Sequence, residues 1–195
     1  QRAGARRGAV HEDPTGANRR LGGALWEFRC VSVRVRKLEP MDTIAVRDLR
    51  LEGLRLSPQN FGSSWEEEAT QPLAWWESRL GGGAHWLGAE IGSELAGLTV
   101  VSLNHRMKLA HNAEVGAVYV AERFRRRGVG TALMQSAMEY LKSRALFATL
   151  TVNAQNHEAR RLYERSGFIV CGQLERGLIV DGVFYDELMM RARFT

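Results

Sequence analysis

The sequence has few cysteines and no long hydrophobic run. Cys30 and Cys171 are the two cysteines; they lie far apart and show no CxxC or histidine-rich spacing, so neither a disulfide framework nor a metal site is indicated. The longest apolar runs, such as Leu98 to Leu103 and Leu146 to Val152, are far shorter than the roughly 20 residues that a membrane span needs. We therefore expect a soluble protein without a metal, in a reducing compartment such as the cytoplasm.

The main part of the chain also lacks an excess of charge of one sign. The net charge is +5, but residues 1–36 hold eight arginines against three acidic residues, and from Lys37 onward basic and acidic residues are equal in number, 19 of each. A body with balanced charge offers no domain-wide field for a polyanion. The composition therefore argues against nucleic-acid binding by the body.

Residues 1–30 lack the continuous apolar segment of a signal peptide and are rich in Gly, Ala and Arg without periodicity. We interpret them as an irregular or disordered leader. A transit peptide is the alternative, and Glu12 and Asp13 count against it. The hydrophobic content of 45% and charged content of 25% are those of a globular protein. One domain is therefore expected over residues 31–195.

Hydrophobic periodicity predicts strands and helices along this domain. The segment after Ser57-Pro58 has the composition of a loop. The expected strands are Val31 to Val35, His85 to Ile91, Leu95 to Asn104, Ala113 to Val120, Leu146 to Asn153, Phe168 to Val180 and Val183 to Arg193, and the expected helices cover about 45–56, 72–80, 129–144 and 156–165.

The connections between these elements predict the topology. Gly92-Ser93-Glu94 and Asp181-Gly182 are typical of tight hairpins, which join antiparallel strands. The helix over 129–144 makes a crossover, which places the strand after it parallel and adjacent to the strand before it. The predicted fold class is therefore α/β: a mixed, mostly antiparallel sheet with one parallel strand pair and helices on both faces.

The segment RFRRRGVGTAL, residues 123–133, leads from the strand before this crossover into its helix. Glycines let a backbone approach a ligand closely, and the free N–H groups and positive dipole end of a helix start attract an anion. A pyrophosphate suits such a site. The segment is neither a P-loop, since no Lys-Ser/Thr follows the last glycine, nor a GxGxxG motif. Taken alone, a glycine-rich loop before a helix is more often only a turn.

Two motifs together resemble the GNAT superfamily of N-acetyltransferases. Arg125-x-x-Gly128-x-Gly130 matches the family's Q/R-x-x-G-x-G/A, and TVNAQNHEARRLYERSGF follows it at the family's separation. The resemblance covers about residues 31–193, and the predicted order of elements is that of the GNAT fold. The second family motif, N-x-x-N-x-x-A-x-x-L-Y-x-x-x-G-F, is matched at Asn153, Asn156, Ala159, Leu162, Tyr163, Gly167 and Phe168.

This resemblance implies that acetyl-CoA binds as co-substrate. Its pyrophosphate would lie on the backbone N–H groups of the loop, and its pantetheine between the strands that end near Val120 and Asn153, where splayed strands leave backbone groups unpaired. Asn156 would also cap its helix, which alone would explain an asparagine there. The expected cofactor-binding residues are Val118, Tyr119, Val120, Arg125, Arg126, Arg127, Gly128, Val129, Gly130, Thr131, Asn153, Asn156 and Tyr163.

The resemblance also implies direct attack of an amine on the thioester, with a backbone N–H near Val118 to Val120 stabilising the oxyanion. Tyr163 matches the family's tyrosine near the CoA sulfur and is the expected acid. Packing is its alternative role. Glu114, at the start of a strand where some family members carry a glutamate, is the expected base, and a solvated charge is its alternative role.

Acceptor specificity in the family comes from the first helices, their loop and the last hairpin. Aromatic side chains beside Glu66, Glu67 and Glu68 could bind a cationic amine, although the three glutamates also fit a solvated helix start. Of Trp75 and Trp76, one is expected in the core. The expected acceptor residues are Phe61, Trp65 and Tyr185.

We therefore expect an acetyl-CoA-dependent N-acetyltransferase that acts on a small-molecule amine. A protein N-terminal amine or lysine is the alternative acceptor. An acyl-CoA-binding sensor without catalysis also stays open, although the presence of both Tyr163 and Glu114 argues against it. Nucleic-acid binding through the leader and the arginine run would predict affinity that falls steeply with salt. A homodimer is left open.

Overall fold

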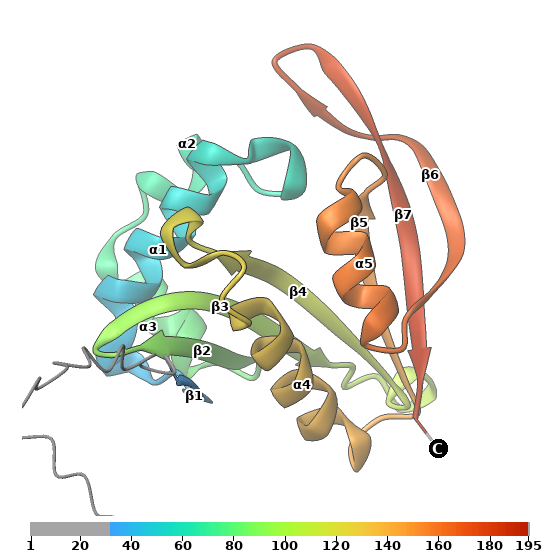
Figure 1. The fold of residues 1–195 in the computed structure, drawn as a ribbon, viewed down its shortest axis with the longest axis horizontal. Helices are drawn as coiled ribbons and strands as arrows, with labels where there is room; N and C mark the ends of the chain where they lie inside the picture. Colours follow the sequence, from blue (N-terminus) through green and yellow to red (C-terminus); the bar gives the residue numbers. More distant parts are fainter. Residues whose placement is uncertain (1–31, 195) are drawn as a thin grey trace, which may run out of the picture. The chain divides into compact units, whose positions relative to one another are not determined.

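The computed structural model describes residues 32–194, which form a seven-stranded mixed sheet with helices (Figure 1). The predicted leader, residues 1–30, lies outside the described residues. The strand order is β1-β2-β3-β4-β5-β7-β6. The elements are β1 (Val33–Lys37), α1 (Thr43–Leu56), α2 (Trp65–Ala69), α3 (Leu73–Gly81), β2 (His85–Ile91), β3 (Glu94–Leu103), β4 (Asn112–Val120), α4 (Val129–Lys142), β5 (Phe147–Asn153), α5 (His157–Arg165), β6 (Ile169–Val180) and β7 (Val183–Arg193), with 3-10 turns η1 (Pro40–Asp42), η2 (Pro58–Asn60), η3 (Met107–Leu109) and η4 (Glu122–Phe124).

The strand pairing confirms the predicted topology. Strands β4 and β5 are parallel, and the other neighbouring pairs are antiparallel. The parallel pairing covers only Asn112 to Glu114 against Phe147 to Thr149. Beyond these residues the two strands diverge, and Figure 1 shows the resulting V. One half of the sheet holds β1 to β4, and the other holds β5, β7 and β6.

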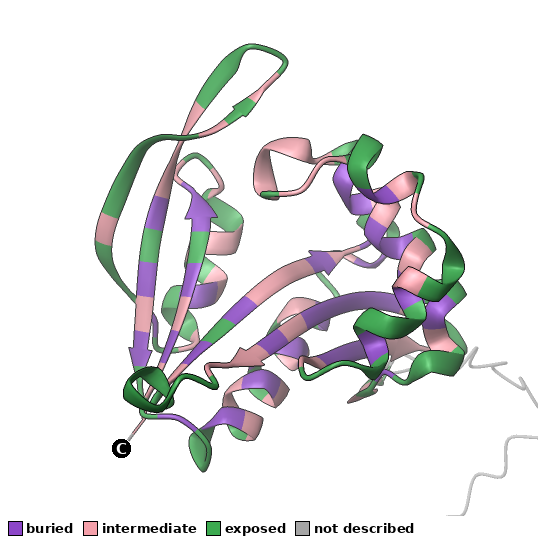
Figure 2. Ribbon diagram, turned by 180° about the vertical axis from the view of Figure 1, so that it is seen from behind, coloured by how far each residue is buried: buried purple, intermediate pink, exposed green. Residues whose placement is uncertain are grey.

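Helices cover both faces of the first half of the sheet. Gly97 of β3 lies against Val129 and Leu133 of α4, whereas the neighbouring Leu98 pairs with Tyr119, whose ring packs on Gly53 of α1. Because successive residues of a strand point to opposite faces, α4 and α1 lie on opposite sides. Figure 2 shows buried residues along the strands of this half and an exposed β6–β7 hairpin. The prediction of helices on both faces is confirmed.

Two local features differ from the sequence prediction. The segment predicted as a loop contains the short helix α2, whose N-cap Ser64 accepts a hydrogen bond from the Glu67 N–H while the Glu67 side chain bonds back to the Ser64 N–H. Strand β4 carries a bulge: Ala117 and Val118 both lie opposite Thr99 of β3, and Ala117 has φ of +51°. Periodicity alone does not reveal a single inserted residue.

Candidate active site

A cavity of about 730 Å³ lies where β4 and β5 diverge. Val118 to Val120 form one wall and Thr151 to Asn153 the other. The loop before α4, the start of α4, helix α5, η2 and Tyr185 complete it. Because β4 has no strand partner beyond Glu114 on its β5 side, its backbone N–H and C=O groups on that side lack a strand partner and can bind a ligand, apart from the Val120 carbonyl, which accepts from Arg125.

The loop at the start of α4 has the backbone conformation that its glycines predict. Gly128 is the N-cap of α4 with φ of +82°, a conformation that favours glycine. The Ala132 N–H bonds to the Gly128 carbonyl, so the N–H groups of the three residues before Ala132 have no acceptor within the helix. Gly130 has a different reason to be glycine, because a Cβ there would lie 3.1 Å from Leu162 of α5.

The arginines of this loop separate into different roles. Arg125 donates from Nε to the Val120 carbonyl at 3.3 Å and lines the cavity, as does Arg126. Arg127 does not line it, and its guanidinium lies 5.8 Å from the Phe124 ring. Arg123 forms ion pairs with glutamates of α1 and β3 at 3.3 to 3.4 Å.

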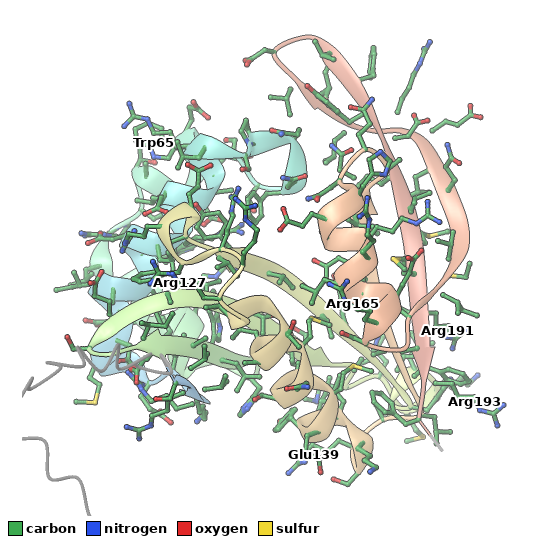
Figure 3. All side chains as sticks on the ribbon, in the orientation of Figure 1. Trp65, Arg127, Glu139, Arg165, Arg191 and Arg193 are labelled. Carbon is green, nitrogen blue, oxygen red and sulfur yellow. The ribbon has the colours of Figure 1, made fainter. Side chains whose placement is uncertain are left out.

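Arg165 of α5, which sequence reasoning missed, also lines the cavity. It further lines a second cavity of about 500 Å³ between α4 and α5, and the two cavities share Thr131 and Leu162. Figure 3 shows Arg165 on the side of α5 that faces α4, away from the loop that carries Arg127. The signal available in the sequence was its place two residues after Tyr163, within the matched motif.

Tyr163 lies on α5, lines the cavity and is only 7% exposed. Burial raises the pKa of its phenol well above the ordinary value, because removal from water disfavours the phenolate. The phenol is therefore protonated at neutral pH.

Glu114 is not brought to the cavity. It lies where β4 still pairs with β5, and its side chain is exposed. Its predicted role as base would require a path through water. Glu158, an exposed residue in the first turn of α5, is the carboxylate that lines the cavity, and sequence reasoning had not singled it out.

The side chains of Asn153 and Asn156 line the cavity, yet both bond to protein groups. Asn153 donates to the Gln59 carbonyl at 2.9 Å and accepts from the Gln155 N–H at 2.8 Å. Asn156 donates to Oδ1 of Asn60 at 3.1 Å and caps α5 by accepting from the Ala159 N–H at 3.0 Å. The predicted N-cap is confirmed.

Of the expected acceptor residues, Phe61 and Tyr185 line the cavity, whereas Trp65 does not and is 39% exposed. The Phe61 ring lies 6.2 Å from that of Tyr119, whose hydroxyl donates to Glu52 of α1 at 3.0 Å. Burial, followed by the Glu52 carboxylate, raises the pKa of Tyr119. The wall that Phe61 and Tyr119 form is therefore hydrogen-bonded to α1. The core position expected for one of the two adjacent tryptophans is filled by Trp76.

The three glutamates of α2 differ in burial and in their partners. Glu66 and Glu67 are exposed, as a solvated helix start predicts, but Glu68 is buried and bonded twice to Arg50 of α1, at 2.9 and 3.0 Å. The Arg50 guanidinium also lies 4.8 Å from the Phe61 ring centroid. Burial alone would raise the pKa of Glu68, but the hydrogen bonds and charge of Arg50 outweigh it and hold that pKa below its ordinary value.

The structure is a mixed sheet opened between two parallel strands, with the glycine-capped start of α4 at the opening. Residues 50–168 match the model of the acetyltransferase (GNAT) family. The chain belongs to this family.

Individual relatives agree with this assignment. The chain is 42% identical over 57 residues to an uncharacterized N-acetyltransferase of Methanocaldococcus jannaschii, a match that spans 29% of this chain and 25% of the relative. A GNAT-family acetyltransferase of Streptococcus pneumoniae shares the fold with a TM-score of 0.75 at 22% identity, over 84% of this chain and 100% of that one. A putative acetyltransferase of Salmonella typhimurium, solved with its cofactor acetyl-CoA, gives 0.70 at 18% identity, over 84% and 95%. At these identities the two structures show the fold alone.

Two features are absent from residues 32–194. None of the helices there has the length and apolar character to cross a membrane. Within the same range, His, Cys, Asp and Glu do not gather in groups of three that could hold a metal ion.

The Arg50–Glu68 pair leads to a prediction about stability. Glu68→Gln leaves a buried guanidinium without its counter-ion, and we expect a loss of about 3 kcal/mol of unfolding free energy at pH 7. Because the folded pKa of Glu68 is lowered, the pair stabilises above the unfolded pKa, and this contribution disappears as pH falls through the folded value. Urea unfolding of both proteins between pH 7 and pH 3 should show the difference shrinking toward low pH. Glu66→Gln, at an exposed position, is the control; an equal loss for Glu68→Gln at pH 3 and pH 7 would contradict the ion pair.

Proposed function

We propose that the protein transfers the acetyl group of acetyl-CoA to a primary amine, with a small molecule as acceptor, by direct attack in a ternary complex. One observation carries this proposal: a single cavity joins the free N–H groups at the start of α4 to the unpaired edge of β4. These donors fit a pyrophosphate and the amides of a pantetheine arm. Family membership supports acetyl-CoA as the ligand.

The residues around the cavity suit the chemistry of amide formation. Bound acetyl-CoA supplies a thioester, whose carbonyl carbon bonds to the amine nitrogen as the bond to sulfur breaks. The bulge at Ala117 and Val118 interrupts the ladder between β4 and β3, and the residue left unpaired there can offer an N–H to the carbonyl oxygen. Tyr163 holds a proton for the departing sulfur. The amine proton passes to Glu114 through water.

Two further observations support a small-molecule acceptor and a location in the cytoplasm. The loop Gln59 to Phe61 is bonded across the acceptor end of the cavity, which favours a compact amine over a long peptide. Cys171 is an exposed free thiol, a state compatible with a reducing compartment such as the cytoplasm.

Acetyl-CoA binding and thiol release test the function. We expect acetyl-CoA to raise the midpoint of thermal unfolding, and one or more members of a panel of small amines to cause thiol release. Turnover of peptides with a free N-terminus or a lysine, and of no small amine, would instead favour a protein acceptor. Binding of acetyl-CoA without turnover of any amine would favour a sensor, and absence of stabilisation would refute the cofactor assignment.

Tyr163→Phe tests the proton donor. Loss of general acid catalysis should lower kcat by about 10²- to 10⁴-fold while the Kd for acetyl-CoA changes little, because the ring still packs at its site. Tyr140→Phe is a suitable control, since Tyr140 stacks on His85 and lines neither cavity. Full turnover by Tyr163→Phe would remove Tyr163 as the acid.

The position of Arg165 in both cavities suggests that it binds the 3′-phosphate of CoA, with the adenosine between α4 and α5. A charged hydrogen bond is worth about 1.5–3 kcal/mol, so Arg165→Ala should weaken CoA binding by at least about tenfold. Dephospho-CoA, which lacks this phosphate, should bind wild type and variant alike in isothermal titration. Arg161→Ala, on the same helix but outside both cavities, is the control. Equal weakening of the two ligands by Arg165→Ala would disprove the assignment.

A further inference from the structure

The loop between α1 and α2 reaches from one half of the sheet to the other. Through α1 it belongs to the first half, because α1 packs on β3 and β4. Its 3-10 turn η2 nevertheless contacts β5 and β6 of the second half. We call residues 57–61, which include η2 and end at Phe61, the acceptor loop.

Two asparagines of the second half hold this loop. Asn153, at the end of β5, donates from Nδ2 to the Gln59 carbonyl, and Asn156, the N-cap of α5, donates from Nδ2 to Oδ1 of Asn60. In each case Oδ1 serves the residue's own element, by accepting from the N–H of Gln155 or Ala159. An amide can donate and accept at once, whereas an aspartate could only accept.

These bonds lie at the open end of the V. Pairing between β4 and β5 is restricted to Asn112 to Glu114 at the closed end. Side-chain bonds from Thr149 to the Ala113 carbonyl and from Arg191 to Asn112 lie at that closed end as well. Within residues 32–194, the side-chain hydrogen bonds that span the open end are the two made by Asn153 and Asn156.

The acceptor loop places an aromatic wall of the cavity. Phe61 follows η2 directly, and its ring is held by the Arg50 guanidinium on one side and the Tyr119 ring on another. Asn153 is 4% exposed, so its bond to Gln59 is shielded from water. Arg50 and Tyr119 hold Phe61 to the first half of the sheet, and the bonds from Asn153 and Asn156 hold its loop to the second half. The position of Phe61 relative to the second half therefore depends on those two bonds.

We propose that Asn153 and Asn156 are positioning residues that latch the acceptor loop across the opening, and so set the place of the acceptor amine relative to the thioester. This inference rests on the proposed acetyl transfer. It differs from the sequence expectation, in which both asparagines contact CoA, because their amide groups are already bonded to the protein. Opening the latch raises KM for the amine and lowers kcat, with little effect on acetyl-CoA.

A double-mutant cycle between Asn60 and Asn156 tests the latch. In Asn60→Asp the Asn156 amide can still donate, and in Asn156→Asp the Asn60 amide can rotate and donate, while the new carboxylate still caps α5. The double variant places two carboxylates face to face, which breaks the Asn60–Asn156 bond of the latch, leaves the bond from Asn153 to Gln59 in place and keeps the cap. We expect the double variant to raise KM for the most active amine of the panel by about tenfold more than the product of the single effects, with a similar Kd for acetyl-CoA.

Hydrogen exchange gives a readout that needs no acceptor. Amides of residues 57–64 should exchange faster in the double variant than in either single variant, while the thermal unfolding midpoint shows that the fold is kept. Multiplicative single effects, with exchange unchanged in the double variant, would overturn the latch. So would an acetyl-CoA Kd that rises as much in Asn156→Asp as in the double variant, because Asn156 would then be a CoA ligand. If wild type fails to bind acetyl-CoA, the proposed function fails, and the exchange comparison still decides the latch.

Discussion

The arrangement of the site depends on the early end of the hydrogen-bonded ladder between β4 and β5. After three residue pairs the two parallel strands separate, and each keeps its outer partner, β3 or β7. A buried strand edge without a partner is costly unless something satisfies its backbone groups. The opening can therefore accept a ligand with amide groups in place of a strand, and the cavity lies there.

Two helices meet at this opening, and glycines determine how closely they do so. Gly128 allows the left-handed turn that aims the first N–H groups of α4 toward the cavity, and Gly130 allows Leu162 of α5 to approach. The positive charge near the loop comes from two sources. Arg125 and Arg126 belong to the loop, whereas Arg165 arrives from α5. The arginine run of the sequence therefore supplies only part of this positive charge. Arg123 forms ion pairs with glutamates of α1 and β3, and Arg127 does not line the cavity.

Local sequence signals predicted most of the fold, because they report on neighbours in the chain. Alternation and helical spacing located the strands and the long helices, the crossover gave the parallel pair, and Asp181-Gly182 gave the last hairpin. The motifs brought twelve of the thirteen expected cofactor residues to the cavity, all except Arg127. What could not be predicted depends on distant contacts: the burial of Glu68 by Arg50, the bulge in β4, and the bond from Asn153 to Gln59, which lies 94 residues away.

The two asparagines show that a match to a family motif does not by itself establish contact with a ligand. Asn153 ends β5 and Asn156 caps α5, so each has a structural reason to be present that operates without any ligand. Their second hydrogen bonds reach the acceptor loop, whose residues lie outside both motifs. In the function that we propose, cofactor recognition rests mainly on backbone groups around α4 and β4, which many sequences can supply. The acceptor side would then rest on particular side chains that line the cavity, namely Asn60, Phe61 and Tyr185, and these would decide the choice of amine.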